Sequence, residues 1–222
     1  NFNMMIMVIY ALITIAIFGM WYYARYEGNF LPSPKKTFNP MMLAAIVILV
    51  PGTQFAANFI ANLTGYIRPD WLQQYNELFE TSGITDTTFV TVLYSVILAP
   101  ICEELIFRGV TMRCARKALP FALANLMQAA LFGLFHLNWI QGIYAFALGI
   151  VLGYVCECGG SIYYSIGLHL LFNLWGTLSG FFPDPGNSVV VFVIVIAVTI
   201  VSLVVGFVLF NKGRRKLPIN ST

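Results

Sequence analysis

The sequence predicts an all-α membrane protein, a polytopic transmembrane helix bundle of about seven spans that forms one membrane-embedded domain over residues 1–222. The first observation is composition, because 59% of the residues are apolar and only 9% are charged, against about 45–50% and about 25% in soluble domains. The second is that the apolar residues form long uncharged runs rather than the short alternating segments of a membrane β-barrel. So few charges would not cover a soluble surface of this size.

Composition also argues against two other classes of protein. The chain contains 19 Phe, 11 Tyr and 4 Trp residues, which favour burial over intrinsic disorder. Its net charge of +3 comes from short clusters and not from the basic face of a nucleic-acid-binding protein. We therefore expect the lipid bilayer as the surroundings and no nucleic acid as a partner. The four cysteines lack zinc-ribbon spacing, and no metal or cofactor is predicted.

Seven runs approach the length of about 20 residues that crosses a bilayer. We place them at about 4–24, 41–63, 88–107, 119–137, 139–156, 161–180 and 188–210. The fourth and fifth are divided near Asn138, because the uncharged stretch there is too long for one span. The first run lacks a basic n-region and a small-residue cleavage site, so we expect a span rather than a signal peptide.

Basic residues in the connections predict the orientation of the chain. Eleven of the 12 fall on one side of a seven-span topology: Arg25, Lys35 and Lys36, then Arg108, Arg113, Arg116 and Lys117, then Lys212, Arg214, Arg215 and Lys216. The acidic residues Asp70, Glu77, Glu80, Asp86 and Asp184 fall on the other. The positive-inside rule therefore predicts a multi-pass cell-membrane protein whose C-terminus and basic loops are cytoplasmic.

Residues 70–82 form an amphipathic pattern in the second connection. Their aromatic and leucine residues recur at helical spacing, opposite glutamine and glutamate. Pro69-Asp70 is a helix start signal and Gly83 a stop signal. Two alternatives are open: a helix that lies on the outer membrane surface, and an ordinary loop helix.

Two adjacent carboxylates near the end of the third predicted span are costly in a membrane. Glu103 and Glu104 leave a helix about 100° apart, so they can face different partners. Glu104 and Arg108 are four residues apart, which favours a salt bridge. Pro100, just upstream, is expected to begin or kink the helix. The alternative is that the two acids merely mark the membrane boundary.

Both histidines of the chain lie on polar stripes of predicted spans. His136 shares a helical face with Asn125, Gln128 and Phe132, and His169 shares one with Asn173. Polar stripes on apolar helices face the interior of a bundle. A structural hydrogen-bonding role is the alternative for each histidine. Gly149 and Gly153 form a small-xxx-small pair that allows close helix packing.

These groups are suited to the direct activation of water. Neither a Gly-x-Ser-x-Gly nor a His-Glu-x-x-His motif is present. Glu103 can accept a proton from water with the assistance of His136, while His169 and Asn173 can donate hydrogen bonds to an oxyanion. Two alternatives remain: a metal-dependent protease that uses Glu103 or Glu104 with His136 and His169, and a non-enzymatic scaffold or bacteriocin-immunity protein.

Three motifs in order resemble those of the CPBP family of CAAX proteases and bacteriocin-processing proteins (Abi). They are Glu103-Glu104 with Arg108, Phe132 with His136, and His169 with Asn173, within residues 88–180. The six polar members of these motifs, called the six motif residues below, are the candidate catalytic residues: Glu103, Glu104, Arg108, His136, His169 and Asn173. The resemblance implies a glutamic intramembrane endopeptidase similar to type II CAAX prenyl endopeptidases. It implies a core of eight helices, a peptide or lipidated-protein substrate, and supporting roles for Glu104 and Arg108.

Overall fold

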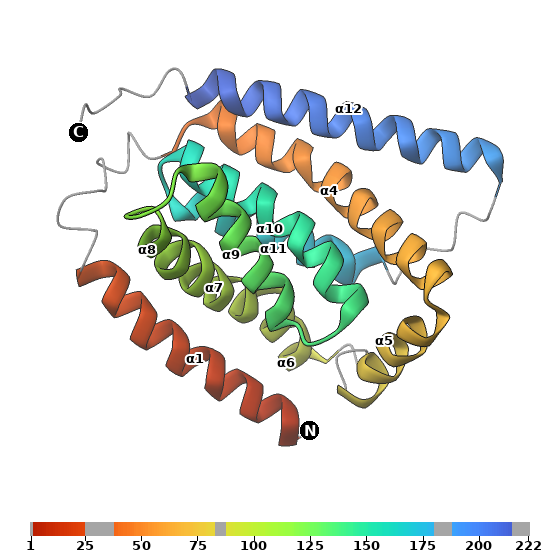
Figure 1. Cartoon of the computed structure of the whole chain (residues 1–222), viewed down its shortest axis with the longest axis horizontal. Helices are drawn as coiled ribbons and strands as arrows, with labels where there is room; N and C mark the ends of the chain where they lie inside the picture. Colours follow the sequence, from red (N-terminus) through yellow and green to blue (C-terminus); the bar gives the residue numbers. More distant parts are fainter. Residues whose placement is uncertain (1, 25–37, 83–87, 180–187, 215–222) are drawn as a thin grey trace.

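The computed structural model describes residues 2–24, 38–82, 88–179 and 188–214, which form eight helical rods (Figure 1). Seven rods are α1 (Phe2–Tyr22), α4 (Pro40–Ile67), α5 (Pro69–Ser82), α9 (Phe121–Phe135), α10 (Trp139–Gly159), α11 (Ile162–Ser179) and α12 (Val189–Arg214). The remaining rod is continuous and consists of α6 (Phe89–Val92), the π-helix η2 (Leu93–Leu98), α7 (Ala99–Glu104), the π-helix η3 (Leu105–Met112) and α8 (Arg113–Ala115). The predicted all-α bundle is confirmed.

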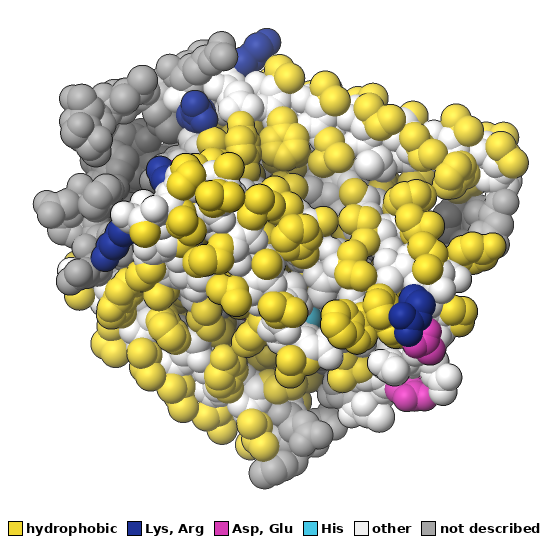
Figure 2. Space-filling view, viewed as in Figure 1, with side chains coloured by type: hydrophobic (Ala, Val, Ile, Leu, Met, Phe, Trp, Pro, Cys, Tyr) yellow, Lys and Arg dark blue, Asp and Glu magenta, His cyan; other side chains and the backbone are white. Residues whose placement is uncertain are grey.

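Each of the seven predicted spans corresponds to one helical rod of the described chain. Five are long and apolar enough to cross a membrane: α1, α4, the α6–α8 rod, α10 and α12. α9 is an apolar helix of 15 residues, and α11 has 18 residues that include the polar stripe. Large apolar side chains cover the visible surface of the bundle (Figure 2). The protein is therefore a multi-pass membrane helix bundle.

The third span is longer than the sequence predicted. The rod continues to Ala115, so the predicted end near residue 107 is wrong. Glu103 consequently lies near the middle of the span and not at its end. Arg108 is fully buried, so its assignment to a loop was also wrong. The helix continues within the bundle past Arg108 because Glu104, four residues earlier, neutralises the charge of this side chain.

α4 and α12 lie side by side along one face of the molecule, and α1 lies on the opposite face against the α6–α8 rod (Figure 1). The main apolar core joins α4, α10, α11 and α12. Pro51 lies inside the continuous helix α4, and the Ser202 hydroxyl of α12 is inserted beside it. This hydroxyl accepts from the Gly52 N–H at 2.9 Å and donates to the Ile48 carbonyl. A side chain from a neighbouring helix thus completes the hydrogen bonding beside a proline.

The predicted amphipathic helix is present as α5, at the end of the bundle where α4 ends and α10 begins (Figure 1). Trp71 stacks on Trp139 of α10 with ring centroids 5.3 Å apart. Arg68 forms an exposed ion pair with Asp70 at 2.6 Å, and this hydrogen bond lowers the pKa of the Asp70 carboxyl. α5 is therefore docked onto the bundle through its aromatic face.

Several residues on which the orientation was predicted lie outside the described residues. They are Arg25, Lys35, Lys36, Asp86, Asp184, Arg215 and Lys216, and the stop signal Gly83 lies there too.

Candidate functional site

A buried ion pair forms the centre of the candidate site. Arg108 Nη1 donates to Glu104 Oε1 at 2.7 Å, and both side chains are completely buried. The predicted salt bridge between these two residues is confirmed. Because a lone charge in a bundle interior costs several kcal/mol, neither group would be stable here without the other. The pair fixes the Glu104 carboxylate in one position.

The guanidinium of Arg108 is held by two other helices. Its Nη2 donates to the Gly149 carbonyl of α10 at 3.3 Å, and its Cζ lies 4.5 Å from the centre of the Phe132 ring of α9. Gly149 also allows the close approach of α9 to α10, since a Cβ atom there would lie 3.1 Å from Ala129 Cβ. Gly153 similarly accommodates Asn125 of α9. The predicted packing role of the two glycines is confirmed.

His169 of α11 lies between the two adjacent carboxylates. Its Nδ1 is 2.9 Å from Glu104 Oε1, and its Nε2 is 3.6 Å from Glu103 Oε2. The imidazole is almost fully buried, whereas 15% of the Glu103 side chain is exposed. Glu103 and Glu104 therefore face different surroundings, as their helical spacing predicted. The carboxylate held by Arg108 orients the imidazole, and the freer carboxylate lies toward its other nitrogen.

His136 occupies the end of α9 rather than the interior of a span. It is the C-cap residue of that helix, where Leu137 turns the chain with φ 52° and Asn138 caps α10. The predicted span over residues 119–137 placed His136 within a helix, and this was wrong, because α9 ends just before it. Its Nδ1 donates to the Phe132 carbonyl at 2.8 Å. In the neutral form this leaves Nε2 as a base.

Phe132 joins the two histidines into one site. The His136 ring meets it edge to face at 4.9 Å between centroids, and the His169 ring does so at 5.8 Å. His136 is half-buried while His169 is buried. The phenyl ring forms an apolar wall between the buried and the accessible imidazole.

Asn173, one turn after His169, has a partner that the sequence did not indicate. Its Nδ2 donates to the backbone carbonyl of Ser95, in the π-helix η2, at 2.8 Å. Asn125 and Gln128, which share the stripe of His136, bond to α10 carbonyls instead: Asn125 to Ile150 at 3.0 Å, and Gln128 to Gly149 at 2.8 Å. Only Phe132 and His136 of that stripe join the site.

Two residues near the carboxylates, one buried and one partly buried, were not among the predicted site residues. Ser165, one turn before His169, is fully buried and interacts with Glu104, whose Oε2 has no hydrogen-bond partner among the described residues. Tyr144 of α10 lies close enough to Glu103 to interact with its charge, and its side chain forms a hydrogen bond with Tyr75 of α5. Ser165 shared the helical stripe of His169, which was a usable signal. Nothing in the sequence near Tyr144 distinguished it.

The metal alternative needs three ligands in one place. In the part of the chain that the structure describes, no group of three or more His, Cys, Asp or Glu side chains is arranged to hold a metal ion. Glu104 Oε1 is already engaged by Arg108 and His169. The proposed set of one carboxylate with His136 and His169 is therefore not assembled in this arrangement.

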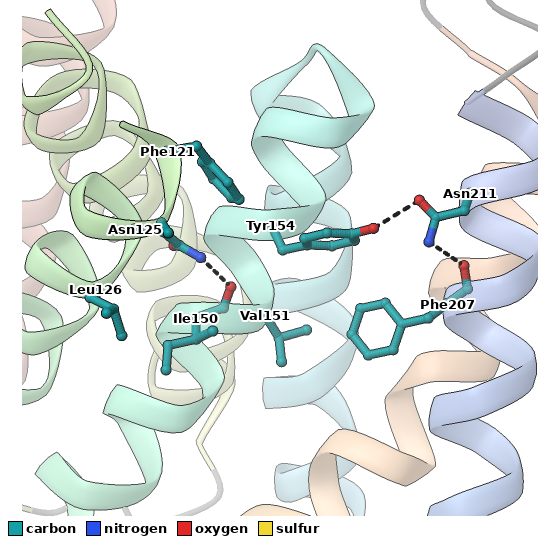
Figure 3. A pocket seen from close by; sticks show the side chains of 9 residues that line it. Phe121, Asn125, Leu126, Ile150, Val151, Tyr154, Phe207 and Asn211 are labelled. Atoms are coloured by element: carbon teal, nitrogen blue, oxygen red, sulfur yellow. Dashed lines mark hydrogen bonds between the residues drawn. The ribbon is translucent and has the colours of Figure 1, made fainter. Parts of the chain in front are cut away.

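A separate groove opens between α9, α10 and α12 (Figure 3). Its volume is about 550 Å³, and none of the six motif residues lines it. Two polar contacts cross it, from Asn125 to the Ile150 carbonyl and from Tyr154 Oη to Asn211 Oδ1 at 2.8 Å (Figure 3). Both contacts satisfy polar groups between helices and are unconnected with Glu103.

Fold and site together define a class of protein, a multi-pass membrane helix bundle with a buried cluster of carboxylates, an arginine and histidines. Residues 85–175 match the family model described as type II CAAX prenyl endopeptidase Rce1-like, and this range contains all six motif residues. The motif-bearing part of the chain therefore matches the CAAX-protease family that its motifs resemble. Comparisons with curated proteins and with solved structures gave no match.

Proposed function

We propose that this protein is an intramembrane endopeptidase of the glutamic type, in which Glu103 activates water without a covalent intermediate. The observation that carries the proposal is the position of His169 between Glu103 and Glu104. A histidine oriented by one fixed carboxylate beside a second, freer carboxylate is an arrangement suited to proton transfer. The family match supports proteolysis as the reaction.

Glu103 is the best candidate for the base because it is the partly accessible member of the carboxylate pair. It takes a proton from water, and the resulting hydroxide adds to the carbonyl carbon of the scissile peptide bond. Glu103 then returns that proton to the leaving amine. His136, with Nδ1 engaged by the Phe132 carbonyl, has Nε2 available to assist at the accessible side of the site.

His169 is the proposed donor to the oxyanion. Its Nδ1–H is directed to Glu104, so in the protonated form Nε2–H is presented on the Glu103 side. A donor of this kind contributes about 2.7–4 kcal/mol to transition-state stabilisation in a site that excludes water. Glu104 and Arg108 do not contact the reacting atoms in this scheme. They hold the imidazole in position.

The substrate class follows from the surroundings of the site, which is enclosed by apolar helices. We propose a membrane-associated peptide or lipidated protein, cleaved by a single membrane-embedded domain. Exposed basic side chains gather where α8 and α12 end, whereas the acidic side chains of α5 lie at the other end (Figure 2). We propose that the basic end is cytoplasmic. His136 and α5 then belong to the opposite half of the bundle.

Glu103→Gln tests the proposal, because the amide keeps the shape of the side chain and removes the base. We expect cleavage of prenylated and unprenylated CAAX-type reporter peptides by the purified protein in nanodiscs to fall about 10²–10⁴-fold, the usual contribution of a general base. Glu157→Gln is the matched control, since Glu157 only pairs with Arg116 at the surface. Undiminished cleavage by Glu103→Gln would contradict the mechanism, whereas the absence of cleavage by the wild-type protein would favour the scaffold alternative.

A further inference from the structure

The third span has a backbone carbonyl that its own helix leaves unpaired. In η2 the bonding runs from each N–H to the carbonyl five residues earlier, and the last such bond joins the Ala99 N–H to the Tyr94 carbonyl. The next donor in this register would be residue 100, paired with the carbonyl of Ser95. Residue 100 is a buried proline, which has no N–H. The π-helix therefore ends here for a chemical reason, and Ser95 loses its helical partner.

Asn173 supplies the missing donor from another helix. Its Nδ2 lies 2.8 Å from the Ser95 carbonyl oxygen. An unpaired carbonyl inside a membrane bundle is costly, because neither water nor lipid replaces the lost bond. A related arrangement occurs beside Pro51, where the Ser202 hydroxyl bridges the Gly52 N–H and the Ile48 carbonyl. In both spans a polar side chain of a neighbouring helix restores the hydrogen bonding near a proline.

We infer that Asn173 is a positioning residue, whose amide fixes the π-helical register of η2 and thereby the direction in which Glu103 and Glu104 leave the span; its effect on catalysis rests on the function proposed above. A π-helical turn contains an extra residue relative to an α-helical turn. Loss of that register would rotate the following side chains by about 100°, the angle of one helical residue. Glu103 lies one turn after Pro100, so it would rotate away from His169.

The location of Asn173 strengthens this assignment. Asn173 and His169 lie four residues apart on one face of α11, so one helix face bonds both to the π-helix and to the carboxylates after it. The bond to Ser95 therefore sets the distance between α11 and the third span at the site. This use of the amide differs from the direct contact with an oxyanion that the sequence suggested.

Pro100→Ala provides a sharp test, because an alanine at position 100 has the N–H that can reach the Ser95 carbonyl in the π register. We expect Asn173→Ala to lower the rate of reporter cleavage at least about 100-fold, because a misplacement near 1 Å already has that effect. We also expect it to lower the melting temperature in detergent by about 3–10 °C. Combining it with Pro100→Ala is expected to restore most of both losses. Asn173→Asp has nearly the same shape without the donor, and the same rescue is expected.

Thr177→Val is the matched control on the same face of α11, because the Thr177 hydroxyl bonds within its own helix. Pro100→Ala should not rescue this variant: Thr177→Val should change the melting temperature by the same amount in the wild-type and in the Pro100→Ala background. If the losses caused by Asn173→Ala and Asn173→Asp are unchanged by Pro100→Ala, Asn173 acts elsewhere and the inference is overturned. The melting temperatures decide this even if the wild-type protein cleaves no reporter. In that case the proposed function fails, while the positioning role stands or falls separately.

Discussion

Removing the Glu104 carboxylate is the most informative perturbation of the buried ion pair. Glu104→Ala leaves the guanidinium of Arg108 without its anion, in a place where neither side chain has any exposure to solvent. It also removes the acceptor that lies 2.9 Å from His169 Nδ1. Breaking a buried pair in this way costs about 3–5 kcal/mol, because the remaining charge keeps its desolvation cost.

The magnitude converts into a measurable change in thermal stability. For a chain of this length, 1 kcal/mol corresponds to about 2–4 °C, so Glu104→Ala should lower the melting temperature in detergent by about 6–20 °C. Glu104→Leu combined with Arg108→Met removes both charges and keeps most of the volume. Because such a replacement is often neutral or stabilising relative to the intact pair, this double variant should be more stable than Glu104→Ala by at least about 3–5 kcal/mol. It should nevertheless be inactive, since His169 loses its orienting carboxylate.

The comparison of Glu104→Ala with the double variant separates two roles of the ion pair, the orientation of His169 and the stabilisation of the fold. If the pair mainly orients His169, the double variant folds and binds a substrate peptide without cleaving it. A melting temperature of Glu104→Ala within about 2 °C of wild type, equivalent to less than about 1 kcal/mol, would refute the reasoning. It would mean that Arg108 is solvated or finds another anion.

Two further predictions concern packing and orientation. Gly153→Ala should destabilise the protein by about 1–3 kcal/mol, because its Cβ would overlap Asn125 Oδ1, whereas Gly167→Ala, with no atom within 4 Å of the added Cβ, should be tolerated; equal melting temperatures would contradict this account of the α9–α10 contact. In intact cells of a Cys-free background, a membrane-impermeant maleimide should label Gln74→Cys in α5 but not Lys117→Cys after α8, because the basic end is expected to be cytoplasmic. The reverse labelling pattern would invert the proposed topology.

Local patterns in the sequence were sufficient for the helices and for the pairs within them. The seven apolar runs all correspond to helical rods, because in a membrane the backbone must satisfy its own hydrogen bonds. The bond between Glu104 and Arg108 follows from helical spacing alone, and so does the divergence of Glu103 from Glu104. The amphipathic helix over residues 69–82 was equally visible in the periodicity. The catalytic roles of the six motif residues remain predictions.

Contacts between helices were decided only by the tertiary structure. The third span continues beyond Arg108 because that cation is neutralised inside the bundle, and residue hydropathy alone cannot register this compensation. The pairing of Asn173 with Ser95 depends on a π-helical register, which has no periodic signature in a stretch of six residues. His169 faces two carboxylates because α11 packs against the third span at one particular height and rotation. Sequence spacing fixes which side chains share a helix face, but the meeting of two faces depends on packing across the whole bundle.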